Sequence, residues 1–476
     1  MLFLLLPAVL AGVRPVEVAA VPRHAHSAVA RVLASNPLTA PPILQNESKA
    51  PHTVEVTITA TVTHLELEPG VRTKVFAYNG QVPGPTLEVW EGDSVIVHFK
   101  NDLPEPTTIH WHGIHLPFHA DGSPFDPVKP GEQYDYVFTV KRGTAGTYWY
   151  HPHPDQRAGP EVAMGLFGAI IVRAADDPLR GLVTEKLLIL HDNRFGPDGS
   201  VDLPNPDSPA GRRDFENGRE GNALFVNGQI MPTVSIRSGE VQRWRVINAS
   251  AARVYRLAIP GHPFLHVGSD GGLFEHPVER DEILLANTER VELLVRGTGR
   301  PGERDTLADL PYNRYIPQTR PADWDSTRNL LTLQYSDDPP VTPVELPTTL
   351  RAVQWLDTTA VTAHRVFALS QGLINGKRMD LHRVDVTVPL GATEIWEIEN
   401  LVGMDHPFHL HGFRFQVLDR DGVPEPFPQW KDTVNVPKHS TVRVIVTFDD
   451  YPGLWMFHCH ILDHEDAGMM GVLEVK

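Results

Sequence analysis

The sequence predicts an all-β protein made of three consecutive β-sandwich domains. Short stretches in which apolar and polar residues alternate dominate the 476 residues, and Pro- and Gly-rich turns separate them. Long stretches of helical periodicity are absent from the sequence. Alternation with a period of two is the pattern of a strand with one buried face, and many such strands with turns between them are typical of sandwiches.

An internal repeat divides the chain into three parts. Similar segments contain the pairs Asn79-Gly80, Asn227-Gly228 and Asn375-Gly376, which lie 148 residues apart both times (79 to 227 and 227 to 375). Asn-Gly is a strong signal for a tight turn between strands, and a period near 150 is that of a domain. After each pair comes an alternating strand that ends at an asparagine: Asn101, Asn248 and Asn400. We expect a leader at 1–49 and domains at 50–175, 176–340 and 341–476, with a long Pro-rich linker within about 310–350.

The leader has features of an export signal. The run from Leu2 to Val13 is apolar and is too short to span a bilayer, and Val18-Ala19-Ala20 is a small-residue cleavage site. The positively charged start of an ordinary signal is missing, since the first basic residue is Arg14. Residues 21–49 are Pro-rich and polar, which predicts disorder. We expect a periplasmic or secreted protein without stable membrane association.

Composition narrows the function. The net charge of −17 argues against nucleic acid or an anionic membrane as partner. The single cysteine excludes an intramolecular disulfide, whereas histidine is abundant, with 24 residues.

Eight histidines form four His-x-His pairs. On a strand, the two imidazoles of such a pair share one face about 6.5 Å apart, which suits two adjacent metals better than one. Three metals with two, three and three ligands would use all eight. The middle domain has no such pair, which predicts a spacer or a wall. The pairs are His110 and His112, His151 and His153, His409 and His411, and His458 and His460.

Four further residues form a second set of metal ligands. The only cysteine, Cys459, lies between His458 and His460 and should point to the opposite face of the strand. With His406, His464 and Met469 it supplies the thiolate, two imidazoles and weak thioether of a blue-copper electron-transfer site.

These clusters, in this order and with these spacings, resemble those of the three-domain multicopper oxidases, and of the bacterial laccase-like members in particular. The resemblance covers about residues 50–476. It implies a cupredoxin-like Greek-key sandwich in each domain. It also implies four copper ions, with a trinuclear cluster between the first and third domains.

The resemblance also implies a role for each matching residue. Asp121 and Glu465 match acids that supply protons to oxygen, and Asp432 matches an acid that in some members lies beside the type 1 copper. The implied copper ligands are His406, Cys459, His464 and axial Met469 for type 1; His110 and His409 for type 2; His112, His151 and His460 for one type 3 ion; and His153, His411 and His458 for the other.

The function implied is a laccase-type oxidase. Phenols or aromatic amines would be oxidised by one electron at the type 1 copper, and dioxygen would be reduced to water at the trinuclear cluster. The alternative is a cuprous or other metal-ion oxidase in copper tolerance. It is disfavoured because the chain has eight methionines and none between Met231 and Met379, whereas Cu(I) prefers thioethers. A third hypothesis, an electron shuttle without turnover, would leave the eight extra histidines without a role.

Overall fold

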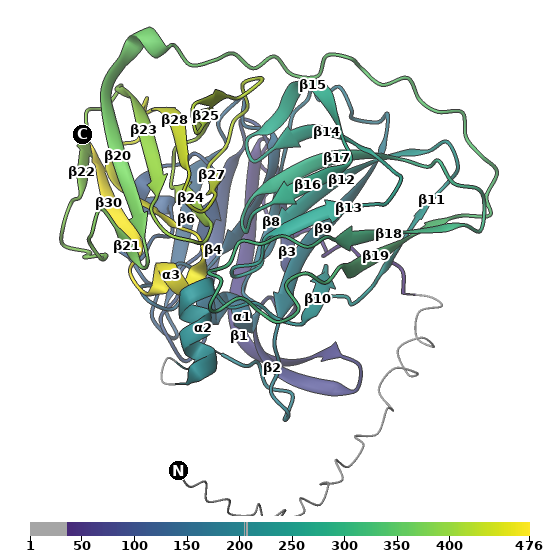
Figure 1. The fold of residues 1–476 in the computed structure, drawn as a ribbon, viewed down its shortest axis with the longest axis horizontal. Coiled ribbons are helices and arrows are strands. Elements are labelled where there is room, and N and C mark those ends of the chain that lie inside the picture. The colour runs from purple at the N-terminus through teal and green to yellow at the C-terminus, as the bar shows by residue number, and fades with distance from the viewer. Residues whose placement is uncertain (1–35, 204, 206–207) are drawn as a thin grey trace, which may run out of the picture. The chain divides into compact units, whose positions relative to one another are not determined.

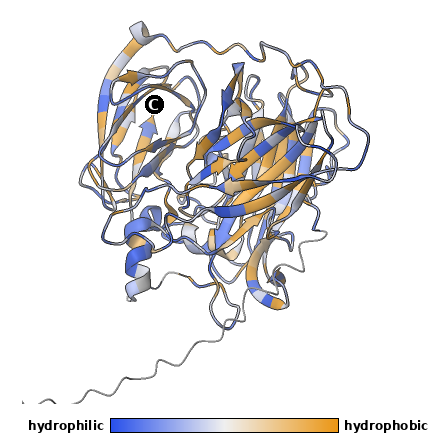
Figure 2. Cartoon of the chain, turned by 45° about the vertical axis from the view of Figure 1, so that its right-hand side comes forward, coloured by the Kyte–Doolittle hydropathy of each residue, from blue (hydrophilic) through white to orange (hydrophobic). Residues whose placement is uncertain are grey.

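The computed structural model describes residues 36–203, 205 and 208–476. Six β-sheets form three sandwiches in sequence order, each with its own apolar core, as the fold class predicted from the sequence requires. Figure 1 shows the three sandwiches, and Figure 2 shows apolar positions interleaved with polar ones along their strands. The three-domain, all-β prediction is therefore confirmed.

The first sandwich contains two four-stranded sheets. They have the orders β2-β1-β4-β6 and β3-β8-β7-β5. The strands are β1 (Thr53–Glu68), β2 (Val71–Tyr78), β3 (Gly84–Trp90), β4 (Ser94–Asp102), β5 (His110–His112), β6 (Gln133–Thr139), β7 (Gly146–His151) and β8 (Gly168–Arg173).

The second sandwich contains sheets of six and five strands. Their orders are β10-β9-β12-β17-β14-β15 and β11-β19-β18-β13-β16. The strands are β9 (Thr184–Asn193), β10 (Ala223–Val226), β11 (Thr233–Ile236), β12 (Val241–Asn248), β13 (Tyr255–Ala258), β14 (Phe264–Ser269), β15 (Gly272–Arg280), β16 (Glu282–Leu285), β17 (Arg290–Arg296), β18 (Arg304–Asp309) and β19 (Arg328–Tyr335).

The third sandwich also contains sheets of six and five strands. Their orders are β21-β20-β23-β28-β25-β26 and β22-β30-β29-β24-β27. The strands are β20 (Val361–Ser370), β21 (Leu373–Ile374), β22 (Val386–Val388), β23 (Thr393–Asn400), β24 (His406–Leu410), β25 (Phe415–Arg420), β26 (Val423–Pro424), β27 (Thr433–Val436), β28 (Thr441–Thr447), β29 (Gly453–Cys459) and β30 (Met470–Val475).

Helices are short and lie in the connections. They are α1 (Ala158–Met164), α2 (Pro209–Asn217) and α3 (Leu462–Asp466), with 3-10 turns η2 (Phe118–Ala120) and η3 (Thr358–Ala360). No helix in the part of the chain that the structure describes is both long and apolar enough to cross a membrane.

The Asn-Gly turns have the same role in all three sandwiches. Asn79, Asn227 and Asn375 all have φ between 51° and 53°, and each is followed by a glycine of positive φ. This is the left-handed conformation that Asn and Gly adopt most readily. Each asparagine side chain accepts a hydrogen bond of 2.7 Å from a backbone N–H of the neighbouring strand. The sequence repeat therefore reflects the same turn conformation in all three sandwiches.

The asparagines that end the following strands also act alike. In each domain the Nδ2 of Asn101, Asn248 or Asn400 donates to two or three nearby backbone carbonyls. Its Oδ1 accepts from the backbone N–H two residues later. One buried amide thus satisfies several backbone groups where the chain leaves the sheet.

The composition of the leader predicted disorder up to residue 49, but residues 37–49 are hydrogen-bonded to the sandwiches. Leu38 N–H donates to the carbonyl of Thr233, and Leu44 N–H donates to that of Thr86, both at 2.8 Å. The segment therefore pairs with β11 of the second sandwich and with β3 of the first. Composition alone does not reveal such pairing. The signal-like run Leu2–Val13 lies outside the described residues.

The long linker predicted within about 310–350 follows β19 and ends at β20, so it overlaps the second part of that stretch and extends beyond it. Between Tyr335 and Val361 the only regular element is η3, and this stretch is the long green connection in Figure 1. It is tied to the middle sandwich by Val341 N–H to the Ser238 carbonyl (2.9 Å) and by Leu350 N–H to the Glu275 carbonyl (2.8 Å). We propose that the domain boundaries fall near 176, between β8 and β9, and near 341, within this linker.

Candidate metal centres

Strand pairing brings the His-x-His pairs together within each sandwich. In the first sandwich β5 pairs with β7, with His110 opposite His151. In the third sandwich β24 pairs with β29, with His409 opposite His458. All eight histidines of these pairs are at most 1% exposed. The first and third sandwiches therefore each present four buried imidazoles at one place.

Packing of the first sandwich against the third closes the cluster. The rings of His110 and His411 stack with centroids 3.9 Å apart, as do those of His112 and His409. Segments about 300 residues apart in sequence thus face each other across one set of eight imidazoles, which we call the eight-histidine cluster.

The donor atoms within this cluster converge. His458 Nε2 lies 2.9 Å from His411 Nε2 and 3.3 Å from His153 Nε2. A neutral imidazole carries only one N–H, so not every one of these three Nε2 atoms can donate a hydrogen bond to another. At least some of them point unprotonated lone pairs at a common place. This donor arrangement fits a metal ion bound by His153, His411 and His458.

A second subset has the same character. The rings of His112, His151 and His460 lie with centroids 5.0–5.6 Å apart. Within the described residues, His112 Nδ1, His151 Nε2 and both ring nitrogens of His460 are buried without a hydrogen-bond partner. The Nε2 atoms of His110 and His409 share this state. Buried polar atoms are rarely left unpaired, so these atoms fit metal ligation.

Burial keeps the imidazoles of the cluster in the neutral form that binds metal. Desolvation, together with the neighbouring rings, lowers the pKa of His112, His151, His409, His411 and His460 well below the usual value. For His153 desolvation lowers the pKa to about 4. Neutral imidazole nitrogens offer a lone pair at any pH near neutrality.

Cys459 lies in a separate ligand set on the other face of β29. Its Sγ is 3.3 Å from His406 Nδ1 and 3.7 Å from His464 Nδ1, and all three residues are fully buried. Burial lowers the pKa of His464 to about 3 and raises that of the Cys459 thiol. A buried thiol of this kind becomes a thiolate when a metal ion binds it.

Met469 is close to Cys459 through the backbone. Its carbonyl accepts the N–H of Cys459 (3.1 Å), and its own N–H donates to the carbonyl of His464 (2.9 Å). Its side chain is fully buried in the same apolar core as Cys459. The four residues expected at a type 1 site therefore gather at one end of the third sandwich.

Asp121 and Glu465 contact the eight-histidine cluster, as the resemblance led us to expect. His411 Nδ1 donates to Asp121 Oδ2 at 2.8 Å, and His110 Nδ1 donates to the Asp121 carbonyl at 2.9 Å. Glu465 Oε2 lies 3.2 Å from His458 Nδ1, and its Oε1 lies 3.4 Å from His153 Nε2. Burial by itself raises the pKa of Glu465, but the imidazoles of His153 and His458 lower it, and the net shift is downward.

Asp432 lies elsewhere than expected. His112 Nε2 donates to its Oδ1 at 3.0 Å, and His409 Nδ1 donates to its carbonyl at 2.8 Å. It therefore contacts the eight-histidine cluster and not the set around Cys459. The reason is strand register, since β27 begins at Thr433 opposite His409, whereas His406 faces Val436 three residues further on. Asp432 thus orients two imidazoles.

The middle sandwich contributes to the cluster, so it is more than the predicted spacer or wall. Arg290 of β17 donates to Asp432 Oδ1 at 2.8 Å and also pairs with Asp432 Oδ2. Asn287 Nδ2 donates to the carbonyl of His460. Thr288 Oγ1 lies 3.1 Å from Thr433 Oγ1. These residues belong to no His-rich motif, so the sequence carried no signal for them.

Trp149 is a further residue at the cluster that was not predicted from the sequence. Its ring stacks on His151, with centroids 4.3 Å apart and 23° between the planes. It also lies 5.4 Å from the ring of His112 and 6.1 Å from that of His460. One indole therefore contacts all three imidazoles of one subset. The motif Tyr148-Trp149-Tyr150-His151 could have suggested this.

The comparisons with known proteins agree with this geometry. Family models described as multicopper oxidase match residues 59–177, 205–337 and 341–476. The chain is 30% identical to the multicopper oxidase mco of Staphylococcus aureus, over 92% of each protein. It is 29% identical to a laccase of Bacillus subtilis, over 92% of this chain and 97% of the laccase.

A solved structure is similar over nearly the whole chain. It is a multicopper oxidase from Campylobacter jejuni, described as a metallo-oxidase. The two share 36% identity over 93% of this chain and 95% of the other, with a TM-score of 0.84. The chain belongs to the multicopper oxidase family. It is an oxidoreductase that uses dioxygen and four copper ions, and the shuttle without turnover is set aside.

Proposed function

We propose that this multicopper oxidase is laccase-like and takes single electrons from phenols and aromatic amines. The observation that carries the proposal is the set of aromatic rings beside the residues around Cys459. Tyr312 OH donates to Asp405 Oδ2 at 2.5 Å, next to His406. The ring of Phe215 lies 6.4 Å from that of His464. Both Tyr312 and Phe215 are partly exposed, so an aromatic reductant has rings to pack against.

We assign the ligands as the sequence analysis expected. Type 1 copper would be held by His406, Cys459, His464 and Met469; type 2 by His110 and His409; and the type 3 pair by His112, His151 and His460, and by His153, His411 and His458. Bound copper supplies one-electron oxidation at the first set and reduction of dioxygen to water at the others.

The chain itself links the two ligand sets, excludes water from the cluster and supplies protons. Cys459 lies between His458 and His460, so a single peptide unit on either side connects the two ligand sets. Burial of all eight cluster histidines excludes bulk water. Asp121 accepts from His411 Nδ1 (2.8 Å), and Glu465 lies between His153 and His458, so we propose that both hold protons for oxygen reduction. Asp432 is assigned to positioning His112.

A second candidate, oxidation of cuprous or other metal ions, is favoured by the burial of the His464 ring. That ring is fully buried, and Phe215 of α2 packs over it. A cover of this kind admits a small ion more readily than a bulky phenol. The similar Campylobacter jejuni protein is described as a metallo-oxidase. We also propose that the chain is exported, in keeping with its signal-like start.

A substrate comparison separates the two candidates. The copper-loaded enzyme is assayed for kcat/KM with a methoxyphenol and with Cu(I) under identical conditions. We expect the phenol to be used efficiently and Phe215→Ala to lower its kcat/KM, because a ring against which the phenol would pack is removed. Arg212→Ala, at an exposed position on the same helix, is the matched control. A large preference for Cu(I), unchanged by Phe215→Ala, would contradict the laccase proposal.

A further inference from the structure

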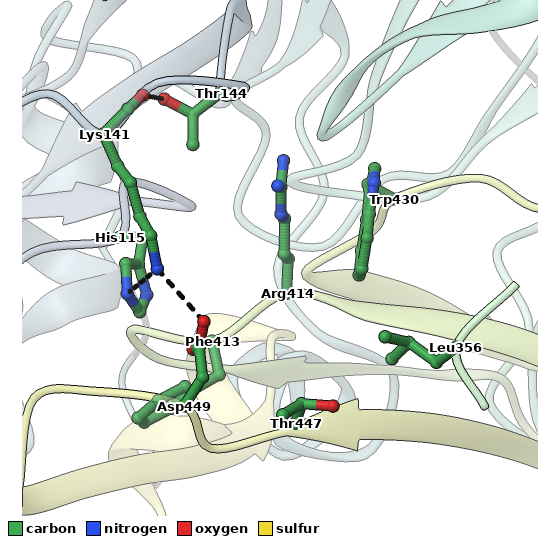
Figure 3. Close-up of a pocket in the computed structure, with 9 residues that line it drawn as sticks. All are labelled: His115, Lys141, Thr144, Leu356, Phe413, Arg414, Trp430, Thr447 and Asp449. Atoms are coloured by element: carbon green, nitrogen blue, oxygen red, sulfur yellow. Dashed lines mark hydrogen bonds and ion pairs between the residues drawn. The ribbon is translucent and has the colours of Figure 1, made fainter. Parts of the chain in front are cut away.

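A cavity of about 250 Å³ lies between the first and third sandwiches. Its walls come from His115, Lys141 and Thr144 on one side and from Phe413, Arg414 and Trp430 on the other. None of these residues is among the proposed copper ligands. Figure 3 shows Arg414 standing in the middle of the cavity, between Trp430 and the side formed by Lys141 and Thr144.

Arg414 is a cation without a counter-charge. Its guanidinium packs on the ring of Trp430, 4.4 Å from the centroid, and one nitrogen donates to the carbonyl of Gly143 at 2.9 Å. Among the described residues, no carboxylate lies within ion-pair distance of it. Burial lowers its pKa. The side chain is only partly buried, and its guanidinium has N–H donors beyond the one that binds the Gly143 carbonyl, so donors remain for a ligand in the cavity.

The neighbouring carboxylates form their direct hydrogen bonds and ion pairs with groups other than Arg414. Asp449 and Asp450 accept from Lys141 Nζ at 3.1 and 2.9 Å, and Asp450 also pairs with His115. Glu91 pairs with Arg351 at 3.3 Å. A carboxylate in direct contact with the Arg414 guanidinium would therefore have to come from a ligand.

The remaining walls indicate what kind of anion fits. Phe413, Leu356 and the face of Trp430 are apolar, whereas Thr144 and Thr447 supply hydroxyl groups. The volume is below the roughly 300–1,000 Å³ of sites for drug-sized ligands, so a single ring is the size that fits. A carboxylate matches the planar fork of a guanidinium and can accept two hydrogen bonds from it.

We propose that this cavity binds a small aromatic carboxylate, with its carboxylate on Arg414 and its ring between Phe413, Leu356 and Trp430. The site is separate from the aromatic rings beside His464 that are proposed to receive the reductant. An occupant would lie against the segment that follows His411 and against the one that precedes Asp432. The proposal does not depend on which reductant the enzyme uses.

Calorimetric titration of the copper-loaded full-length enzyme tests the proposal, with benzoate as the probe. We expect saturable one-to-one binding. Benzamide, which is neutral and has the same shape, should bind at least about tenfold more weakly, because charge-assisted hydrogen bonds are lost. Acetate, a carboxylate without a ring, should also bind more weakly. Absence of saturable benzoate binding would overturn the proposal, and equal binding of acetate would overturn the aromatic assignment.

Variants locate the site. Arg414→Met should weaken benzoate binding about tenfold or more, whereas Arg142→Met, an exposed residue with the same charge change, should leave it unchanged. Circular dichroism and copper content show whether each variant is folded. If Arg414→Met does not fold, Arg414→Lys decides, and we expect a several-fold loss because lysine keeps the charge but not the fork. Unchanged affinity in the folded Arg414 variant would refute the assignment.

Discussion

Replacing Arg290 by methionine removes a buried cation from the place where the three sandwiches meet. Arg290 is fully buried and donates to Asp432 Oδ1 (2.8 Å), to the Thr288 carbonyl (3.0 Å) and to the Thr147 carbonyl (3.1 Å). Methionine has a similar length but no donor. The substitution therefore leaves the Asp432 carboxylate without the cation that compensates it.

The expected loss of stability is large because the pair is buried. Removing one partner of a buried ion pair typically costs about 3–5 kcal/mol, since the other charge stays desolvated. The second effect concerns copper. The Asp432 carboxylate accepts a hydrogen bond from Nε2 of His112, and its backbone carbonyl accepts one from Nδ1 of His409. Loss of such an outer hydrogen bond lowers metal affinity by about 10–100-fold, so we expect copper to leave the eight-histidine cluster more easily.

Two measurements check this prediction. Denaturant unfolding of the copper-free protein gives the change in stability, and copper per protein after dialysis against a chelator gives the change in affinity. Arg256→Met is the control, because Arg256 and Glu282 form a solvent-exposed pair that should be worth at most about 1 kcal/mol. The double variant Arg290→Met/Asp432→Asn should recover part of the loss. If Arg290→Met is no less stable than the control and keeps four copper ions, the positioning role is refuted.

Three further predictions concern other parts of the molecule. Cys459→Ser should abolish the blue absorption and the oxidase activity while circular dichroism stays unchanged; a variant that remains blue would refute the type 1 assignment. Met469→Leu should raise the type 1 potential in a redox titration, because a donor is removed from the copper, and an unchanged potential would count against an axial role. His191 stacks on Phe225 (4.7 Å), and burial lowers its pKa to about 3, so only unfolding lets it take up a proton near pH 5. Stability should thus fall as pH drops from about 6.5 toward 3, by up to about 1.4 kcal/mol per pH unit from this residue. In His191→Phe the decline, measured by denaturant titration at several pH values, should be shallower, and a slope equal to that of the wild type would contradict this account.

Local sequence patterns predicted the fold class, and the histidines and the cysteine that they singled out lie in two buried clusters. The three Asn-Gly turns and the three strand-ending asparagines repeat because each makes the same short-range hydrogen bonds in its own domain. The alternation of side chains along β29 also follows from local geometry. It places Cys459 in the third core, on the face opposite to His458.

Contacts between distant segments were predicted poorly. Asp432 was expected beside the type 1 residues, but the register of β27 against β24 places it at His112 and His409. Arg290 and Asn287 carry no motif, and only the packing of β17 against the other sandwiches gives them a role at the cluster. Residues 37–49 have the composition of a disordered leader, yet they pair with strands that come later in the chain.

The sequence by itself determined which donor atoms the protein has and in what order they occur, because strand alternation and tight turns depend on neighbouring residues only. The tertiary structure decided which imidazoles meet, as in the stacking of His110 on His411. It also decided which carboxylate serves which histidine, and that Arg414 stands without a counter-charge in a cavity between two sandwiches. These properties depend on register and on packing between segments hundreds of residues apart, where burial and not sequence proximity sets the energy of each contact.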